Sequence, residues 1–323
     1  MPTKNKLLTI LMAIFINVDS YGQETATLIA TYSTAIYDNE VKYIYQKILS
    51  QPLSLCEKTD QVSRYFMGTK YSLGALGEGP EGIYDMNPLY RTDAFDCLTY
   101  VSTVLALVEA ANCEEFIRTL KKIHYYNAKV SYFNRYHFTE ADWNVENKNN
   151  HFIRDITAQV SPHYLIAKAL IDKPNWYRCR TKQALKSITS LSKSQSERLL
   201  QEIHQHGKQT TTYMARTSYI PLTEIIHSPA ILECIPSGTI VEIVDQTHDF
   251  KKKIGSDLNI VHLGFAIKTQ QGLMFRHASK VHHQVTEVLL IQYLQRSCAL
   301  SEQPWKIGIH LEAIILPCRG KTK

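Results

Sequence analysis

The sequence has few features of membrane, metal-binding or nucleic-acid-binding proteins. After its first twenty residues it contains no second long apolar run, whereas a membrane-spanning helix needs about 20 apolar residues. It has no Cys-x-x-Cys pair and no Cys and His spacing typical of zinc sites, so we expect neither a metal nor a cofactor. It also lacks a basic block interleaved with aromatics, and we therefore expect no nucleic-acid partner.

The N-terminus has the layout of a secretory signal peptide. Lys4 and Lys6 precede LLTILMAIFINV, a twelve-residue run that is too short to span a bilayer as a helix. The small residues Ser20 and Gly22 follow, and cleavage after Gly22 would remove residues 1–22. The alternative is an uncleaved first helix. The signal predicts an exported protein, either periplasmic or secreted.

The remaining residues, 23–323, are predicted to form a single domain. The chain has 323 residues, and its 44% hydrophobic content is enough for a core without disulfides or metals. The net charge of +6 is a mild excess that favours anionic surroundings. We expect a soluble monomer without an integral membrane segment once the signal is removed.

Seven cysteines lie after the signal peptide, which is an odd number. An exported protein meets an oxidising environment, so disulfides are possible, but at least one thiol stays outside any intramolecular pairing. The other six could pair or could equally be buried thiols. The seven are Cys56, Cys97, Cys113, Cys179, Cys234, Cys298 and Cys318.

The hydrophobic pattern predicts helices first and strands last, which indicates an α+β domain with an antiparallel sheet. The middle segment 127–152 is aromatic, polar and poorly periodic, and is interpreted as a loop. Glycine and proline predict another loop over 69–88. Helices are predicted over 38–52, 54–68, 96–111, 112–123, 192–208 and 286–297, and strands over 238–246, 259–269, 272–279 and 305–316.

Cys97 is the candidate nucleophile. It follows Asp96 directly and precedes an apolar helical stripe, so it lies in the first turn of a helix. The unpaired N–H groups at a helix N-terminus favour a thiolate and can later stabilise an oxyanion. This position suits acyl transfer. The alternative is a structural thiol or a disulfide partner.

Two of the thirteen histidines lie on successive predicted strands, His262 in NIVHLGFAI and His277 in LMFRHAS. A short turn at TQQG would bring these strands together as an antiparallel pair. His262 could then act as the base, and His277 could orient it through its second nitrogen. The alternative for either histidine is a buried, hydrogen-bonded polar group.

These residues carry a resemblance. FDCLTYV at a helix start, then HLGFAI and HAS on successive strands, resembles the NlpC-type branch of papain-like cysteine peptidases. The match is closest to the N-acetylmuramoyl-L-alanine amidase-like cysteine hydrolases, over most of residues 60–316. GTKYSLGALGEG, NRYHFTEADW, RDIT, SYIPLTEI and SGTIVEIVDQ are similar to segments found in that order in this family.

The resemblance implies a papain-like fold and hydrolysis of the amide between N-acetylmuramic acid and L-alanine in peptidoglycan or muropeptides. It implies that Cys97 is the nucleophile, His262 the base and His277 the orienting residue. Tyr71 matches an active-site tyrosine that helps with the oxyanion or the substrate, although Tyr84 and Tyr90 also precede the nucleophile. Asp96 is counted among the binding residues.

A long insertion, residues 112–235, separates the nucleophile from the base. We expect it to form the walls of the active-site cleft. NRYHFTEADW places Arg135, His137 and Trp143 within nine residues. Arginine suits a stem-peptide carboxylate, and tryptophan offers a flat face to a sugar ring. The alternative is a solvated loop with a core aromatic.

Three functions fit the sequence. The first is a muramoyl-alanine amidase, and the second is an NlpC-type endopeptidase that cuts within the stem peptide. The third is a cell-wall-binding module that has lost catalysis. The complete Cys, His, His set argues against the third, and the family-like flanking segments favour the first over the second.

Overall fold

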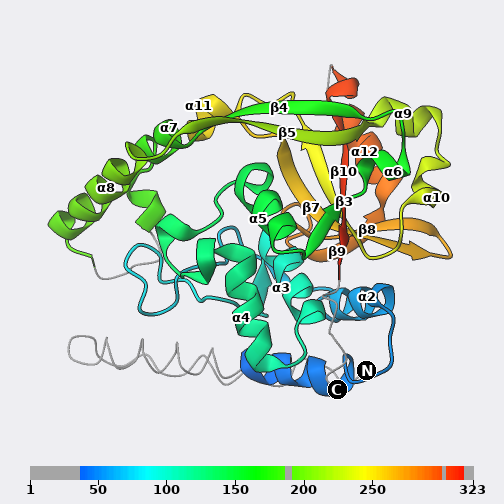
Figure 1. Cartoon of the computed structure of the whole chain (residues 1–323), viewed down its shortest axis with the longest axis horizontal. Coiled ribbons are helices and arrows are strands. Elements are labelled where there is room, and N and C mark those ends of the chain that lie inside the picture. The colour runs from blue at the N-terminus through cyan, green and yellow to red at the C-terminus, as the bar shows by residue number, and fades with distance from the viewer. Residues whose placement is uncertain (1–36, 186–190, 300–302, 316–323) are drawn as a thin grey trace.

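The computed structural model describes residues 37–185, 191–299 and 303–315 (Figure 1). The predicted signal peptide and Cys318 lie outside these residues. Among the described helices, none is both long and apolar enough to cross a membrane. The six cysteines that the structure describes are all free thiols, so none of them is paired with another.

A curved sheet of ten strands organises the molecule. Its order is β2-β1-β9-β8-β7-β6-β10-β5-β4, with β3 paired to β10, and only the β1–β2 pair is parallel. The predicted α+β class with an antiparallel-dominated sheet is therefore confirmed. The strands are β1 Lys70–Tyr71, β2 Ala94–Phe95, β3 Ile153–Asp155, β4 Leu165–Asp172, β5 Thr212–Pro221, β6 Thr239–Asp245, β7 Ile260–Thr269, β8 Gly272–Ser279, β9 Gln284–Leu289 and β10 Ile307–Ile314.

The four predicted strands are present as β6, β7, β8 and β10, but the helix predicted over 286–297 begins too early. Residues 284–289 form β9, which pairs with β8 from Gln284 to Leu289. The apolar residues of this stretch fit both a helical and a strand period, and the pairing with β8 makes the first part a strand. The helix α12, Leu290–Ala299, follows directly.

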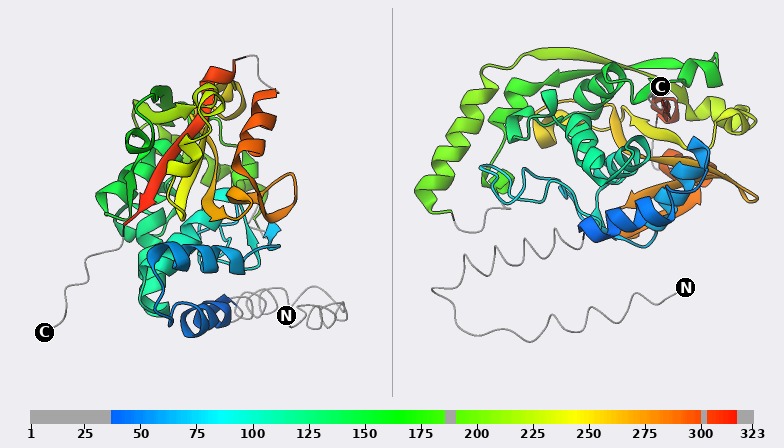
Figure 2. Two further views of the ribbon diagram at one scale, coloured as in Figure 1. Left: turned by 90° about the vertical axis from the view of Figure 1, so that its right-hand side faces the viewer. Right: turned by 60° about the horizontal axis from the view of Figure 1, so that its bottom comes forward.

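Two cores lie on opposite faces of the sheet, because alternate residues of a strand point to opposite sides. On one face, Leu263 and Phe265 pack against the helix α3. On the other face, Ile243 and Phe275 pack with Leu294 of α12. Figure 2 shows the sheet from two further directions. A first helix covers residues 37–47. The other helices are α2 Leu55–Tyr65, α3 Cys97–Glu109, α4 Cys113–His124, α5 Asn144–Asn149, α6 Thr157–Val160, α7 Lys173–Arg178, α8 Lys193–Gly207, α9 Leu222–His227, α10 Ile231–Cys234, α11 Phe250–Ile254 and α12 Leu290–Ala299.

Capping fixes where the helices start. Ser54 and Glu57 form a capping box at the start of α2. At α4 the equivalent capping box is only half formed. Asn112 accepts a hydrogen bond from the N–H of Glu115, but the Glu115 carboxylate accepts from Ala111 instead. Every residue of α3 from Thr99 to Glu109 is buried, so α3 is a central helix rather than an amphipathic surface helix.

Residues 112–235 extend the sheet and add a side lobe. They supply β3, β4 and β5, and β4–β5 form a long ribbon that reaches α7 and α8 at the left of Figure 1. The segment predicted as a loop over 127–152 contains short helical turns, at Tyr126–Ala128, Tyr132–Asn134 and Thr139–Trp143, followed by α5. Buried aromatic side chains such as Phe138 stabilise these turns. Because these residues do not recur at a helical or strand period, the sequence pattern did not predict the turns.

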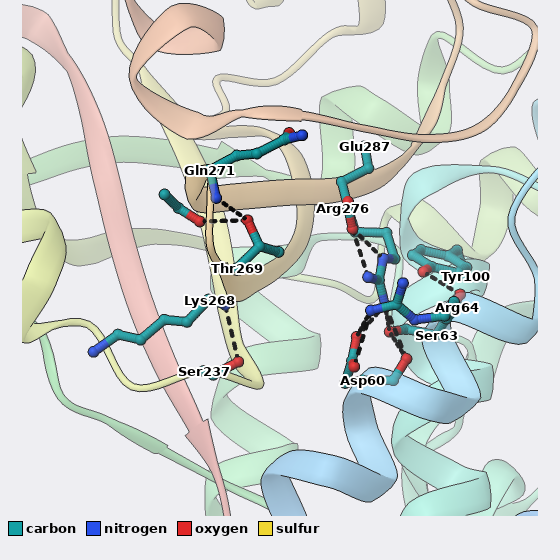
Figure 3. A network of polar contacts seen from close by, with 11 residues as sticks. Asp60, Ser63, Arg64, Tyr100, Ser237, Lys268, Thr269, Gln271, Arg276 and Glu287 are labelled. Carbon is teal, nitrogen blue, oxygen red and sulfur yellow. Dashed lines mark hydrogen bonds and ion pairs between the residues drawn. The ribbon is translucent and has the colours of Figure 1, made fainter.

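A buried arginine fastens α2 to the sheet beside the second histidine (Figure 3). Arg276 of β8 donates to the Asp60 carboxylate at 2.9 Å, to Ser63 Oγ at 2.7 Å and to the Glu287 carboxylate at 2.7 Å. Because these partners come from α2 and β9, three elements are fixed around the residue that precedes His277.

Candidate active site

The chain brings Cys97 to the start of α3 through a tightly capped turn. Asp96 Oδ1 accepts from the Thr99 N–H at 2.8 Å, and Thr99 Oγ1 accepts from the Asp96 N–H at 2.9 Å. The other oxygen, Oδ2, accepts from the Gly74 N–H at 3.1 Å. Both carboxylate oxygens are thus used internally, so Asp96 positions the cysteine and the 72–74 loop.

Cys97 is partly exposed, at the one end of α3 that is not fully buried. Burial, followed by the neighbouring Asp96 carboxylate, raises the pKa of the thiol to about 12. The N–H groups of Leu263, Leu98 and Cys97 itself act in the opposite direction, because they stabilise a negative sulfur. The N-terminal position alone therefore does not produce a thiolate in the resting protein.

His262 and His277 meet as the sequence predicts. The strands β7 and β8 are joined by a two-residue turn between Thr269 and Gly272. His262 Nε2 and His277 Nδ1 lie 2.6 Å apart, a hydrogen bond between two imidazoles. His262 also lies next to Leu263, whose N–H stabilises negative charge on the cysteine sulfur. Cysteine and both histidines are therefore gathered at one place.

Two irregularities of the sheet allow this meeting. The register between β6 and β7 shifts at Ile243 and Val244, which leaves an extra residue in β7 directly before His262. Such bulges re-aim side chains and are common near active sites. The β7–β8 ladder ends at Phe265 and Arg276, so the register continued by one residue places Gly264, which has no side chain, opposite His277.

Both imidazoles are held neutral. Burial lowers the pKa of His262 to about 4, and burial with the neighbouring His262 lowers that of His277 to about 3. His277 Nε2 is buried and has no hydrogen-bond partner within the described residues. A protonated thiol beside a neutral imidazole can transfer a proton during attack, rather than before it.

Tyr71 is beside the cysteine because of the short β1–β2 ladder. Tyr71 pairs with Phe95, two residues before Cys97. Burial, then Cys97 and Asp96, raise the pKa of Tyr71 to about 12, so its hydroxyl stays a donor. The two alternatives are used elsewhere, since the Tyr84 hydroxyl donates to Glu202 and the Tyr90 hydroxyl to Asp38.

Tyr293 is a site residue that the sequence did not reveal. The centre of its ring lies 6.0 Å from that of the His262 ring, with 20° between the ring planes, and 5.4 Å from that of the His277 ring. Phe275 stacks on the His277 imidazole, with ring centres 4.6 Å apart and 14° between the ring planes. The apolar periodicity of residues 290–299 is compatible with simple core packing, and only the tertiary fold brings the Tyr293 ring to the histidines.

The three insertion residues make internal contacts, and the predicted sugar contact of Trp143 is wrong. Trp143 is fully buried in the α3 core, and its indole N–H donates to Ser102 Oγ at 3.1 Å. Arg135 pairs with Asp85 at 2.8 Å, so its carboxylate partner belongs to the chain itself. His137 Nε2 contacts the Tyr132 carbonyl at 2.8 Å, and burial holds its pKa well below the usual value.

Among the described residues, no group of three or more His, Cys, Asp and Glu side chains is arranged to hold a metal ion. The chemistry that the geometry offers is that of a thiol, a neutral imidazole, and nearby backbone and phenolic donors. This set can carry out acyl transfer.

Comparison with known proteins gives a consistent picture. The sequence model of the N-acetylmuramoyl-L-alanine amidase-like family matches residues 61–300. A Legionella pneumophila protein, from a family named as a domain of unknown function, has a crystal structure with TM-score 0.83 at 36% identity, covering 89% of this chain and 97% of that one. An N-acetylmuramoyl-L-alanine amidase from Bacteroides uniformis has TM-score 0.56 at 21% identity, covering 80% of this chain and 98% of that one, which shows a shared fold. A search of curated proteins found no match.

Proposed function

The chain belongs to the N-acetylmuramoyl-L-alanine amidase-like family, and from this premise we propose that it is an exported cysteine hydrolase of peptidoglycan. The bond cut is the amide between the lactyl carbonyl of N-acetylmuramic acid and the nitrogen of L-alanine. The single observation that carries the cysteine mechanism is the hydrogen-bonded pair of imidazoles, His262 and His277, which lies next to Leu263. The N–H of Leu263 stabilises negative charge on the Cys97 sulfur.

In the first half of the reaction, the Cys97 sulfur attacks the lactyl carbonyl carbon while its proton passes to His262. Nε2 of His262 is bonded to His277, so Nδ1 is the nitrogen that accepts this proton. The oxyanion that forms is stabilised by backbone N–H groups at the start of α3, with the Tyr71 hydroxyl as a further donor. The protonated His262 then gives its proton to the L-alanine nitrogen, which leaves as a free amine.

In the second half, the thioester between Cys97 and the lactyl group is hydrolysed. Neutral His262 takes a proton from water as the water attacks the thioester carbonyl, and the proton returns to the departing sulfur. His277 holds His262 in the required orientation throughout. The products are a muramic acid carboxylate and an intact stem peptide.

A helix that carries a cysteine at its N-terminus, packed on an antiparallel sheet that carries the base, is the arrangement of NlpC-type papain-like enzymes. We assign the fold to that group on this basis. The proposed signal peptide over residues 1–22 is consistent with a substrate outside the cytoplasm.

The test is mass spectrometry of purified muropeptides after digestion. The proposal requires free sugar and an intact stem peptide that begins with L-alanine. A shortened peptide still attached to sugar would instead assign the protein as a stem-peptide endopeptidase. Undigested muropeptides that remain bound to the protein would assign it as a wall-binding module.

A further inference from the structure

The turn between β8 and β9, residues 280–283, has an unusual surface. Val281 at its tip is 83% exposed, more than any other large hydrophobic side chain in the described residues. Lys280, His282 and His283 are also exposed. Their side chains make no hydrogen bond or ion pair within the part of the chain that the structure describes. Three ionisable donors and one apolar side chain are therefore offered to solvent together.

This turn is attached to the candidate active site. The His283 carbonyl accepts the N–H of Tyr71 at 2.8 Å, and Lys70 pairs with Gln284 across the β1–β9 ladder. His282 is also near enough to His277 to act on its charge. Two residues after Tyr71 in the chain, Leu73 is 66% exposed. The turn thus lies at the rim of the site that contains Tyr71 and Cys97.

The backbone of the turn favours a different residue from the one it has. His283 has φ of 55°, in the left-handed region where glycine and asparagine are the least strained residues. The chain has a bulky histidine at this position, and the imidazole makes no hydrogen bond or ion pair within the described residues. Strained positions of this kind cluster at ligand-binding sites.

The charged residues of the turn and of the segment around Tyr71 have one sign. Neither 67–73 nor 279–286 contains an aspartate or glutamate, whereas Lys70 and Lys280 are both exposed. The next acidic residue along β9, Glu287, is already bound by Arg276. A ligand that fits this surface carries carboxylates for the ammonium and imidazole donors and small alkyl groups for Val281 and Leu73.

We propose that the 280–283 turn is a subsite for an acidic peptide, and that it binds the free carboxylates of the stem peptide attached to the scissile amide. This assignment rests on the proposed function, because it names the part of the same substrate that extends beyond the reacting bond. An anionic lipid surface has similar chemistry. The contact with Tyr71 favours the peptide, since it places the turn one residue from the catalytic centre.

The first test uses the protein without residues 1–22 and compares two substrates. One is an N-acetylmuramoyl tripeptide with free carboxylates, and the other is the same compound with its carboxylates amidated. Lys280→Glu should raise KM for the acidic compound by about tenfold and leave KM for the amidated compound unchanged. Lys193→Glu, the same charge reversal at an exposed position of α8, should change neither. Equal effects on both compounds, or no effect, would overturn the subsite.

The second test measures binding without turnover, in the Cys97→Ala background. Calorimetric titration with alanyl-glutamyl-alanine should show binding that Lys280→Glu weakens about tenfold, and alanyl-glutaminyl-alanine should bind weakly to both proteins. If the parent enzyme cleaves neither muramoyl compound but this peptide dependence holds, the proposed function fails and the subsite stands. If Lys280→Glu instead abolishes binding to phosphatidylglycerol vesicles and leaves peptide binding unchanged, the turn is a membrane contact and the proposal is wrong.

Discussion

Gly264 lies so close to His277 that a Cβ at position 264 would be 2.8 Å from the Cβ of His277 and 2.6 Å from the Arg276 carbonyl oxygen. Contacts this short are not tolerated, so any larger residue would push β7 and β8 apart. The absent side chain is what lets His262 and His277 approach to 2.6 Å on one face of the sheet.

The first prediction follows from this contact. Gly264→Ala should destabilise the protein by about 1–3 kcal/mol, as overpacking does, and should lower kcat/KM by more than tenfold because the imidazoles separate. Urea unfolding and steady-state kinetics measure the two effects. An alanine variant with wild-type kcat/KM would show that the histidine contact is not needed for turnover.

The second prediction concerns the nucleophile. Cys97→Ala should abolish hydrolysis and leave the fold unchanged by circular dichroism, and iodoacetamide should inactivate the parent enzyme by alkylating the same thiol. Chelators should have no effect on activity. Cys56→Ala, at an exposed cysteine of α2, is the matched control and should keep full activity. Inactivation by chelators, with resistance to iodoacetamide, would contradict the thiol mechanism.

The third prediction is the pH profile. His262 accepts a proton only when neutral, and burial lowers its pKa to about 4. The value of kcat/KM should therefore rise with pH through about 4 and then stay level through neutral pH, because the Cys97 pKa of about 12 keeps the thiol protonated. An acid limb centred near the ordinary histidine pKa of about 6.5 would mean that the base is not buried in this way.

The fourth prediction tests Tyr293 as a positioning residue. Its ring excludes water from both imidazoles, so Tyr293→Ala should lower kcat by about tenfold and move the acid limb of the pH profile upward, toward the ordinary histidine pKa. Tyr293→Phe keeps the ring and should keep both kcat and the profile within about threefold. If alanine lowers the free energy of unfolding but leaves the acid limb in place, Tyr293 serves packing alone.

The fifth prediction concerns Arg135, which we expect to act as a clamp on the loop over 74–91. Arg135→Ala removes the cation that is paired with the buried Asp85 carboxylate and should cost about 3–5 kcal/mol of stability. Hydrogen exchange of residues 74–91 should rise with it. Arg118→Ala, which removes an exposed pair with Glu114, should cost no more than about 1 kcal/mol. Unchanged exchange in the loop would exclude the clamp.

Local sequence signals predicted the elements that hold the chemistry. The apolar helical stripe after Cys97 predicted that this residue begins a helix. Strand patterns and the short turn at TQQG predicted that His262 and His277 lie on paired strands. Signals of this kind act over a few residues, so they survive without tertiary information. Tyr293 was missed because its contact with His262 joins distant segments. Trp143 was misjudged because an aromatic in an aperiodic stretch gives no indication of whether it faces solvent or a core.

The two-residue ladder that joins β1 to β2 has a consequence for the geometry of the candidate site. Both ends of the segment between them are anchored beside the nucleophile, where Ser72 also donates to the Phe95 carbonyl at 2.8 Å. These backbone bonds therefore hold the tyrosine next to the cysteine independently of the side chains in the intervening loop.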